Sequence, residues 1–273
     1  MAGSSVDLAA IRSFLGRAPY LHAYELGDLD PREAPHTTWL ADDPVDAVAL
    51  IYRGLAVPTL VGLAEGDVDR AALLRLLGKV AGALPPRFAA HLSAGVEAVL
   101  APCHALALLG DCFKMALVGT PARDDGGHAI RRLGPEHAGE AVGFYAAHYP
   151  DSHFVPANLE RGPYLAIDDA HGIAAIAGVH VYSPVERVAA LGNIATRRDA
   201  RGRGHARRVT AALCRLLRDE IDIIGLNVRA DNAAAIACYR AVGFEVRHAY
   251  SEWRLERSSD DSRSPASLAM DPV

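Results

Sequence analysis

The chain has 273 residues, of which 51% are hydrophobic and 22% are charged, so it can build one large domain or two small ones. Its formal net charge of −5 provides no basic field of the kind that binds nucleic acid. No apolar run approaches the ~20 residues of a membrane helix, and the N-terminus lacks the basic-then-apolar pattern of a signal peptide. We therefore expect a soluble, cytoplasmic protein with no nucleic-acid or membrane partner.

The first 120 residues are predicted to form one unit. Leu73, Leu76, Leu77 and Val80 fall at i, i+3, i+4 and i+7, which places them on one face of a helix. Short apolar runs bounded by turn residues are typical of buried strands. The elements expected in this unit are strands at 47–52, 58–63 and near 105–109, and helices at 67–80 and 94–100.

A polar, glycine-rich stretch at 121–128 is the predicted linker to a second unit at 129–256. In that unit a helix is expected from Pro135, because proline suits the first helical position. Other helices are expected at 204–220 and 233–242, and strands at 129–133, 164–167, 173–182, 188–196, 223–228 and 244–250. Residues 257–273 show no periodicity and few large apolar side chains, as in a disordered tail.

The four cysteines argue against a metal site. Cys103, Cys112, Cys214 and Cys238 form no Cys-x-x-Cys pair, the spacing typical of zinc sites and thioredoxin-like motifs. The sequence therefore predicts reduced thiols, no disulfide framework and no metal.

The stretch Arg201-Gly202-Arg203-Gly204-His205-Ala206 lies between a predicted strand and a predicted helix. The two glycines tolerate positive φ, so the loop can turn several backbone N–H groups inward. The helix that follows adds unpaired N–H groups and a positive dipole end. Such a loop is a seat for a phosphate or pyrophosphate.

Three other interpretations of this loop are possible. A dinucleotide-binding fingerprint needs a third glycine where Arg207 stands. It also follows the first strand of a βαβ unit, whereas this loop comes late in the chain. A P-loop needs Gly-Lys-Ser/Thr, which is absent. A plain glycine-rich turn remains an alternative for the hexapeptide taken alone.

The residues around the loop resemble one family. Leu191-Gly-Asn-Ile-Ala-Thr196, the loop at 201–206, Gly225-Leu-Asn-Val228, Asn232-Ala-Ala-Ala-Ile-Ala-Cys-Tyr239 and Ala241-Val-Gly-Phe244 are similar in order and spacing to the CoA-binding motifs of the GNAT superfamily of acyl-CoA-dependent N-acyltransferases. The resemblance covers about 130 residues. The first 120 residues more weakly resemble the degenerate N-terminal halves of two-domain members, such as the glycine N-acyltransferase-like group.

The resemblance implies an α/β fold with a mixed, mostly antiparallel sheet flanked by helices, built as two GNAT-like units in tandem. It implies that the strands at 188–196 and 223–228 splay apart beside the loop. The pantetheine arm of acetyl-CoA, or of another acyl-CoA, would pair there with the main chain of Ile194 and Thr196. A backbone N–H near Ile194 or Ala195 would stabilise the oxyanion. The cofactor-binding candidates are therefore Ile194, Ala195, Thr196, Arg201, Gly202, Arg203, Gly204, His205, Ala206 and Asn232.

Several of these residues have a purely structural alternative. Asn232 is also a good N-cap for the helix at 233–242. Arg207 and Arg208 fit either a contact with the 3′-phosphate of CoA or a solvated helix face. Tyr239 is the catalytic candidate for protonating the departing thiolate under the resemblance, and a core aromatic otherwise.

The general base is not fixed by the sequence. An amine acceptor must lose a proton before attack, and the strand at 188–196 carries no carboxylate. His180 on the preceding strand is the second catalytic candidate, since an imidazole titrates near neutral pH, although a lone strand histidine also fits the core. Glu160 and His153, or a water relay to either, stay open.

The predicted function is transfer of an acyl group, most simply acetyl, from CoA to a primary amine of a small molecule. Direct attack is expected because no Cys or Ser sits beside an obvious base. Acylation of a protein or peptide amine and a non-catalytic acyl-CoA-binding regulator are the alternatives. The first unit would shape the acceptor pocket or an interface, and a homodimer is an open alternative to a monomer.

Overall fold

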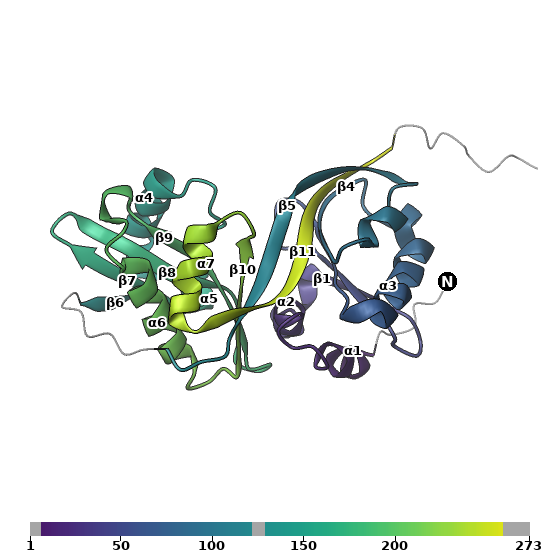
Figure 1. The fold of residues 1–273 in the computed structure, drawn as a ribbon, viewed down its shortest axis with the longest axis horizontal. Helices are drawn as coiled ribbons and strands as arrows, with labels where there is room; N and C mark the ends of the chain where they lie inside the picture. The colour runs from purple at the N-terminus through teal and green to yellow at the C-terminus, as the bar shows by residue number, and fades with distance from the viewer. Residues whose placement is uncertain (1–6, 122–128, 259–273) are drawn as a thin grey trace, which may run out of the picture.

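A computed structural model describes residues 7–121 and 129–258. All described strands join one 11-stranded sheet in the order β1-β2-β3-β4-β11-β5-β10-β9-β8-β7-β6 (Figure 1). The predicted linker, apart from Pro121, lies outside the described residues, and so does most of the predicted tail.

The first unit places helices on both faces of its part of the sheet. Its elements are α1 (Leu8–Leu15), α2 (Ala23–Gly27), β1 (Thr37–Ala41), β2 (Val48–Tyr52), β3 (Thr59–Gly62), α3 (Gly66–Val80), β4 (Arg87–Leu92) and β5 (His104–Leu117), with 3-10 turns at Ala34–His36, Ala81–Ala83 and Val96–Val99. The apolar face of α3 packs on Phe88, Leu92 and other buried residues of this unit.

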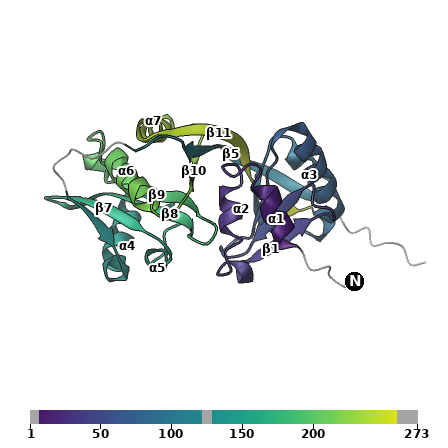
Figure 2. The same ribbon diagram turned by 90° about the horizontal axis from the view of Figure 1, so that it is seen from below.

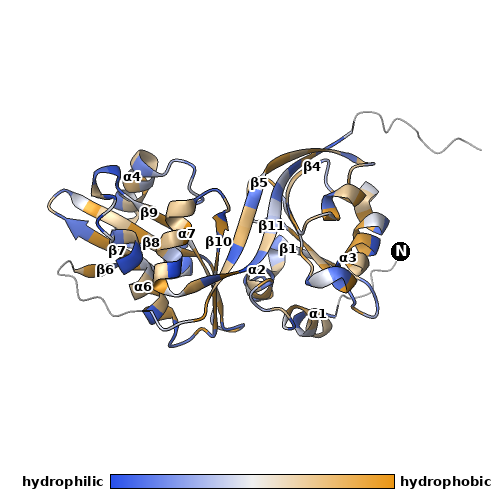
Figure 3. Cartoon of the chain, viewed as in Figure 1, coloured by the Kyte–Doolittle hydropathy of each residue, from blue (hydrophilic) through white to orange (hydrophobic). Residues whose placement is uncertain are grey.

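The second unit carries the glycine-rich loop. Its elements are β6 (Ile130–Leu133), α4 (Ala138–His148), α5 (Asn158–Arg161), β7 (Tyr164–Asp169), β8 (Gly172–Ser183), β9 (Val188–Thr196), α6 (His205–Leu217), β10 (Ile223–Arg229), α7 (Ala233–Val242) and β11 (Phe244–Arg257), with 3-10 turns at Pro135–His137 and Arg198–Ala200. Hydrophobic residues concentrate along the strands, and the connecting loops are more hydrophilic (Figure 3).

The strand order repeats on either side of the β11–β5 pair. In the first unit β3 and β4 are parallel neighbours joined through α3, and in the second β9 and β10 are parallel neighbours joined through α6. The remaining pairs are antiparallel. The sheet is therefore mixed and mostly antiparallel, as predicted, and its two units have similar topologies, although the second has one more outer strand, β6.

The long strands β5 and β11 are exchanged between the units. Strand β5 ends the first unit in sequence, but it pairs with β10 of the second. Strand β11 ends the second unit, but it pairs with β4 of the first. Leu255 of β11 is fully buried in the core beneath α3, and burying one leucine contributes about 1.5–3 kcal/mol. Each unit thus buries a strand that the other supplies.

Helix α2 belongs to the first unit but packs on the second. A Cβ placed on Gly27 would lie 2.0 Å from Val181 Cγ1 of β8, and one on Gly225 of β10 would lie 3.6 Å from Ala23 Cβ. In both views α2 lies where the two units meet (Figure 2). The same face of the sheet carries α4, whereas α6 and α7 cover the opposite face.

The predicted elements of the second unit are largely confirmed, and the strand at 188–196 and the helix at 233–242 match the observed bounds. Three expectations were wrong. The helix expected at 94–100 is only a 3-10 turn at Val96–Val99, because Gly95 at a φ of 86° breaks the chain direction. The strand near 105–109 runs from His104 to Leu117, and the last strand runs to Arg257.

The tail prediction began one residue early, since Arg257 donates hydrogen bonds to the carbonyls of Gly82 and Leu84. Helices α1 and α2 and strands β1 and β4 were not predicted. Within the described ranges, all four cysteines are free. None of the helices described is both long and apolar enough to cross a membrane.

The close approach of Gly27 to Val181 gives a stability test. We expect Gly27→Ala to destabilise the protein by about 1–3 kcal/mol, because the added methyl overpacks a contact with a stiff valine. Gly143→Ala in α4, where a Cβ meets nothing within 4 Å, should instead stabilise by about 0.5–1 kcal/mol. Urea denaturation of both variants measures the difference. Equal stabilisation by the two changes would contradict the packing of α2 on β8.

Candidate active site

The parallel strands β9 and β10 separate at the end nearest the glycine-rich loop. Their last paired residues are Leu191 and Leu226. Beyond them β9 continues to Thr196 paired only with β8, and β10 continues to Arg229 paired only with β5. The facing edges of residues 192–196 and 227–229 therefore have no strand between them in the described structure, and their backbone groups are available to an extended ligand.

The glycine-rich loop lies at the open end of this gap. Gly202 and Gly204 have φ values of 76° and 78°, and Gly204 is the N-cap of α6. Only glycine adopts this left-handed conformation without strain. A Cβ on either glycine would meet no atom within 4 Å, so the loop presents bare backbone at the N-terminus of a 13-residue helix.

The other residues of the loop differ in exposure. Arg201 and Arg203 are exposed, Ala206 is half-buried and the His205 ring is buried. Arg201 Nε lies 3.5 Å from the Thr196 carbonyl, at the edge of hydrogen-bonding distance. The two arginines can thus add positive charge at the surface, whereas His205 can reach an anion only through its backbone N–H.

A buried arginine, which the sequence analysis did not single out, fixes the end of β9. The Arg197 guanidinium pairs with Asp169 and Asp199, both at 2.6 Å, and it donates to the Ile173 carbonyl at 3.1 Å. These contacts fasten the start of the loop to the β7–β8 hairpin. Single arginines near aspartates are also common on protein surfaces, so the sequence alone does not distinguish Arg197 from an exposed arginine.

Strand β9 is distorted at the point where the gap opens. Asn193 has a φ of 52°, and the β8–β9 register shifts between Ile176 and Gly178 and again between Val179 and Val181. The Tyr145 hydroxyl donates to the Asn193 carbonyl at 2.6 Å. Asn193 Nδ2 donates to the Tyr164 hydroxyl at 2.9 Å. This network holds the bulge and sets the direction of the Ile194 and Ala195 N–H groups that follow it.

His180 lies beside the same bulge, over Gly192. A Cβ on Gly192 would come within 2.2–2.3 Å of three atoms of the His180 ring, so the ring occupies the space that a side chain would take. The His153 ring lies 6.1 Å away, centroid to centroid. Although the His180 side chain is exposed, the surrounding protein desolvates its imidazolium form and lowers its pKa to about 4.

Tyr239 lies on α7 at the opposite face of the sheet. Its ring is half-buried and meets Phe244 edge-on at 6.2 Å. Burial raises the pKa of Tyr239, and the neighbouring Cys238 and Tyr149 add to the shift. Within the part of the chain that the structure describes, its hydroxyl has no hydrogen-bond partner. Tyr239 therefore keeps its proton at neutral pH and has it free to donate.

The remaining candidates are more exposed. Asn232 caps α7, since its Oδ1 accepts a hydrogen bond from the Ala235 N–H at 3.1 Å. Its structural role is thus observed, while its side-chain amide remains at the surface. Arg207 is exposed on α6, and Glu160 is exposed on α5. The described residues include no group of three or more His, Cys, Asp or Glu side chains placed to hold a metal ion.

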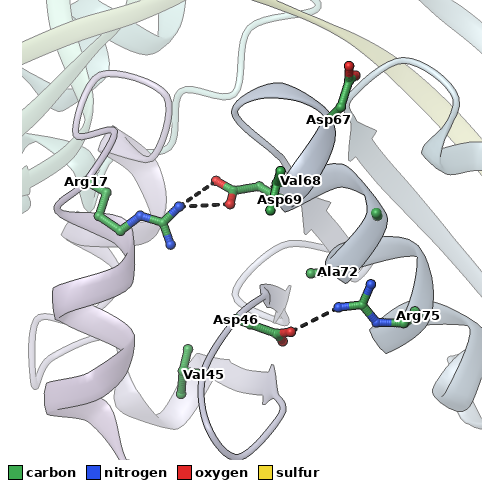
Figure 4. A pocket seen from close by; sticks show the side chains of 9 residues that line it. Arg17, Val45, Asp46, Asp67, Val68, Asp69, Ala72 and Arg75 are labelled. Carbon is green, nitrogen blue, oxygen red and sulfur yellow. Dashed lines mark hydrogen bonds and ion pairs between the residues drawn. The ribbon is translucent and has the colours of Figure 1, made fainter.

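A hollow on the first unit is separate from this gap (Figure 4). Arg17, which follows α1, lines it together with residues of α3 and of the loop before β2. Four of its charged side chains pair with one another, since Arg17 bonds Asp69 at 2.8 Å and Arg75 bonds Asp46 at 3.0 Å. A smaller hollow lies between α4 and the segment at 150–154, next to the stacked rings of Tyr145 and Phe154.

Comparison with known proteins agrees with this geometry. Residues 127–244 match the model of the acetyltransferase (GNAT) family. The match ends at Phe244, the first residue of β11, so it covers the gap, the glycine-rich loop and α7. The second unit is therefore similar in sequence to the acetyltransferases of the GNAT family. No curated protein matches the chain in sequence.

Solved structures share the fold over both units. A GCN5-related N-acetyltransferase from Kribbella flavida is 16% identical, with a TM-score of 0.61 over 86% of this chain and 95% of that one. A GNAT-family protein from Novosphingobium aromaticivorans is 18% identical, with a TM-score of 0.59 over 85% and 96%. A GNAT-family acetyltransferase from Colwellia psychrerythraea is 14% identical, with a TM-score of 0.54 over 90% and 97%. At these identities the likeness concerns the fold alone.

The left-handed glycine at the start of α6 gives a binding test. We expect Gly204→Val to lower acetyl-CoA affinity at least ~10-fold, because a β-branched residue both strains the loop and covers its backbone. Gly172→Val is the matched control, since Gly172 also has a positive φ of 95° and open space around it but lies in the β7–β8 turn. Calorimetry of both folded variants measures this. Equal affinities would remove the loop from the binding site.

The lowered pKa of His180 can be observed directly. In an NMR titration the His180 ring protons should show a midpoint near pH 4, well below the usual value of about 6.5. Because the unfolded chain binds this proton more readily, His180 should reduce stability as the pH falls from about 6.5 toward 4. His180→Gln assigns the resonance and should flatten that part of the stability profile. A midpoint at the usual value would contradict the desolvation.

Proposed function

We propose that this protein transfers an acyl group, most simply acetyl, from CoA to a primary amine of a small molecule. The observation that carries the proposal is the gap between β9 and β10 with the left-handed glycine loop at its open end. The unpaired backbone groups of β9 and β10 can form hydrogen bonds with the amides of a pantetheine arm. The backbone N–H groups at the N-terminus of α6 can bind a pyrophosphate. The family of the second unit supports the same chemistry.

The proposed reaction is direct attack of the amine on the thioester. The amine nitrogen attacks the acyl carbon, and the charge that develops on the oxygen is stabilised by a backbone N–H at Ile194 or Ala195. The C–S bond then breaks as the amide forms. Tyr239 donates its proton to the departing thiolate, which yields free CoA. The proton that the amine has lost protonates the Tyr239 phenolate again, so the reaction needs no other reactant.

His180 has a more limited role in this proposal than its position first indicates. With a pKa of about 4 it is neutral at pH 7 and can accept a hydrogen bond from the amine. However, such a weak base takes a full proton poorly. We propose that His180 orients the amine, and that the proton leaves through another group or water.

A non-catalytic acyl-CoA-binding regulator is the second candidate function. The observation that favours it is the absence of a carboxylate on β9, together with the weak basicity of His180. A thiol-release assay with acetyl-CoA separates the two candidates. Small amines should raise the rate of thiol release well above hydrolysis, whereas a regulator would bind acetyl-CoA without turnover. Including a peptide with a free N-terminus and a lysine tests acylation of a protein amine.

The proposed acid gives a sharper test. We expect Tyr239→Phe to lower kcat at least ~10-fold, because general acid help is typically worth about 10²–10⁴-fold and solvent replaces part of it. Acetyl-CoA affinity should change less than about threefold, since the thioester sulfur needs a proton only as the bond breaks. Tyr20→Phe, a half-exposed tyrosine of the first unit, is the control and should keep full activity. Full activity in Tyr239→Phe, with unchanged thermal stability, would leave the tyrosine a packing residue.

A further inference from the structure

A cluster of charged side chains lies where the two units meet, outside the matched region of the family. This junction cluster consists of five residues. They are Tyr24 and Glu25 of α2, Asp28 at the C-terminal end of α2, Lys114 of β5 and Glu252 of β11. Tyr24 and Asp28 are one helical turn apart, so they share a side of α2. Lys114 lies directly opposite Asn227 of β10 in the sheet, and Asn227 is the first residue of β10 beyond its last pair with β9.

The buried part of this cluster is incompletely satisfied. Glu25 and Lys114 are each only 3% exposed. Glu25 Oε1 lies 2.9 Å from His22 Nδ1, but Glu25 Oε2 is buried without any hydrogen bond. Lys114 Nζ is 4.0 Å from that oxygen, too far for a hydrogen bond, and it lies over the Tyr24 and Tyr250 rings at 5.0 and 5.6 Å. Buried carboxylate oxygens normally accept a hydrogen bond, and none of the described residues donates one to Glu25 Oε2.

The charges of the cluster do not cancel. Lys114 offsets Glu25, but the half-buried Asp28 carboxylate has neither a hydrogen bond nor an ion pair within the described residues. Burial raises the pKa of Asp28 well above its usual range, with the charges of Glu25 and Glu33 adding to the shift. A carboxylate that is desolvated without a cation is costly to keep ionised.

Glu252 is the second uncompensated carboxylate. It accepts a hydrogen bond from the Tyr250 hydroxyl at 3.1 Å and lies 3.6 Å from His91 Nε2. Burial lowers the pKa of His91, so the imidazole is neutral at pH 7 and leaves the Glu252 charge in place. Glu252 therefore keeps an uncompensated negative charge at the junction, and a cation bound beside Asp28 would favour the ionised form of that carboxyl group.

Electrostatic coupling connects this cluster to the proposed reaction centre. Burial raises the pKa of Tyr24, and Glu252, Asp28 and Tyr239 add to the shift. The pKa of Tyr149 is raised mainly by burial, and the charges of Asp151 and Glu252 add to the shift. The interaction between two charged groups weakens with distance and is screened by salt, so it is appreciable only between groups that lie near each other. Tyr24 therefore lies close enough to Glu252, Asp28 and Tyr239 to interact with them electrostatically.

We propose that the junction cluster is the acceptor site and that it takes a small amine carrying a second positive charge, held by Asp28 and Glu252. This inference rests on the proposed function, since it names the substrate of the same site. The reacting amino group would lie toward Tyr24 and the gap, and the distal ammonium would supply the cation that the two carboxylates lack. An acceptor with a distal carboxylate would instead add another uncompensated negative charge beside Glu252, which is costly in a partly desolvated site.

Three probes of equal chain length test the charge preference. We expect kcat/KM for 1,4-diaminobutane to exceed that for 1-aminobutane at least ~10-fold, and 4-aminobutanoate to be the poorest acceptor. A preference for 4-aminobutanoate, or equal rates for all three, would overturn the inference while leaving acyl transfer to amines intact. If no amine raises thiol release although acetyl-CoA binds, the proposed function itself fails.

Two nearly isosteric variants test the residues. Asp28→Asn and Glu252→Gln should each raise KM for 1,4-diaminobutane at least ~10-fold and narrow its advantage over 1-aminobutane, with acetyl-CoA affinity unchanged. Glu245→Gln removes an exposed charge from the same strand β11 and should leave the selectivity as in the wild type. Thermal melting identifies a variant that fails to fold. Folded variants that lose activity equally toward all three amines would contradict cation recognition by these carboxylates.

Discussion

The antiparallel pairing of β5 with β11 holds the two units in one sheet, and the rest of the molecule depends on it. Each strand leaves the unit in which its sequence begins and continues into the other. The backbone hydrogen bonds of the pair cannot be replaced by water without exposing buried residues such as Met115 and Leu255. As a result the two units cannot separate without opening both cores, and side chains from both have fixed positions at their junction.

The same pairing explains how a gap can persist in the middle of a sheet. Strand β10 is held on one side by β5, and β9 is held on one side by β8. Strands β9 and β10 can therefore separate beyond Leu191 and Leu226, because each keeps its hydrogen bonds to its other neighbour. The bulge at Asn193, fastened by Tyr145 and Tyr164, turns β9 away. Under the proposed function, the ligand would be recognised in this gap mainly by backbone groups.

The chemistry of the candidate site is divided between the units. The second unit supplies the glycine loop, the gap and Tyr239, all within the matched family region. It supplies no carboxylate on β9, and His180 is held neutral by its surroundings. In the proposed acceptor site, carboxyl groups instead come from the end of α2 and from the far end of β11, both outside that region. Under the proposed function, the first unit, which has no such glycine loop among its described residues, would shape the acceptor side.

The sequence by itself determined the local features of this protein. Helical periodicity and turn residues located α3, α6, α7 and most strands of the second unit, because these patterns reflect each element's own buried face. The loop at 201–206 was recognisable because positive φ demands glycine at Gly202 and Gly204.

The tertiary structure alone decided what depends on distant pairs. The sequence did not indicate that β5 and β11 exchange, that α2 packs on β8 through Gly27, or that Asp28, Lys114 and Glu252 meet. Short helices such as α2 carry almost no periodic signal, and a charged residue has the same local pattern whether it is solvated or buried at a junction. Contacts between residues far apart in the chain are fixed by how the elements assemble, and no local spacing records that.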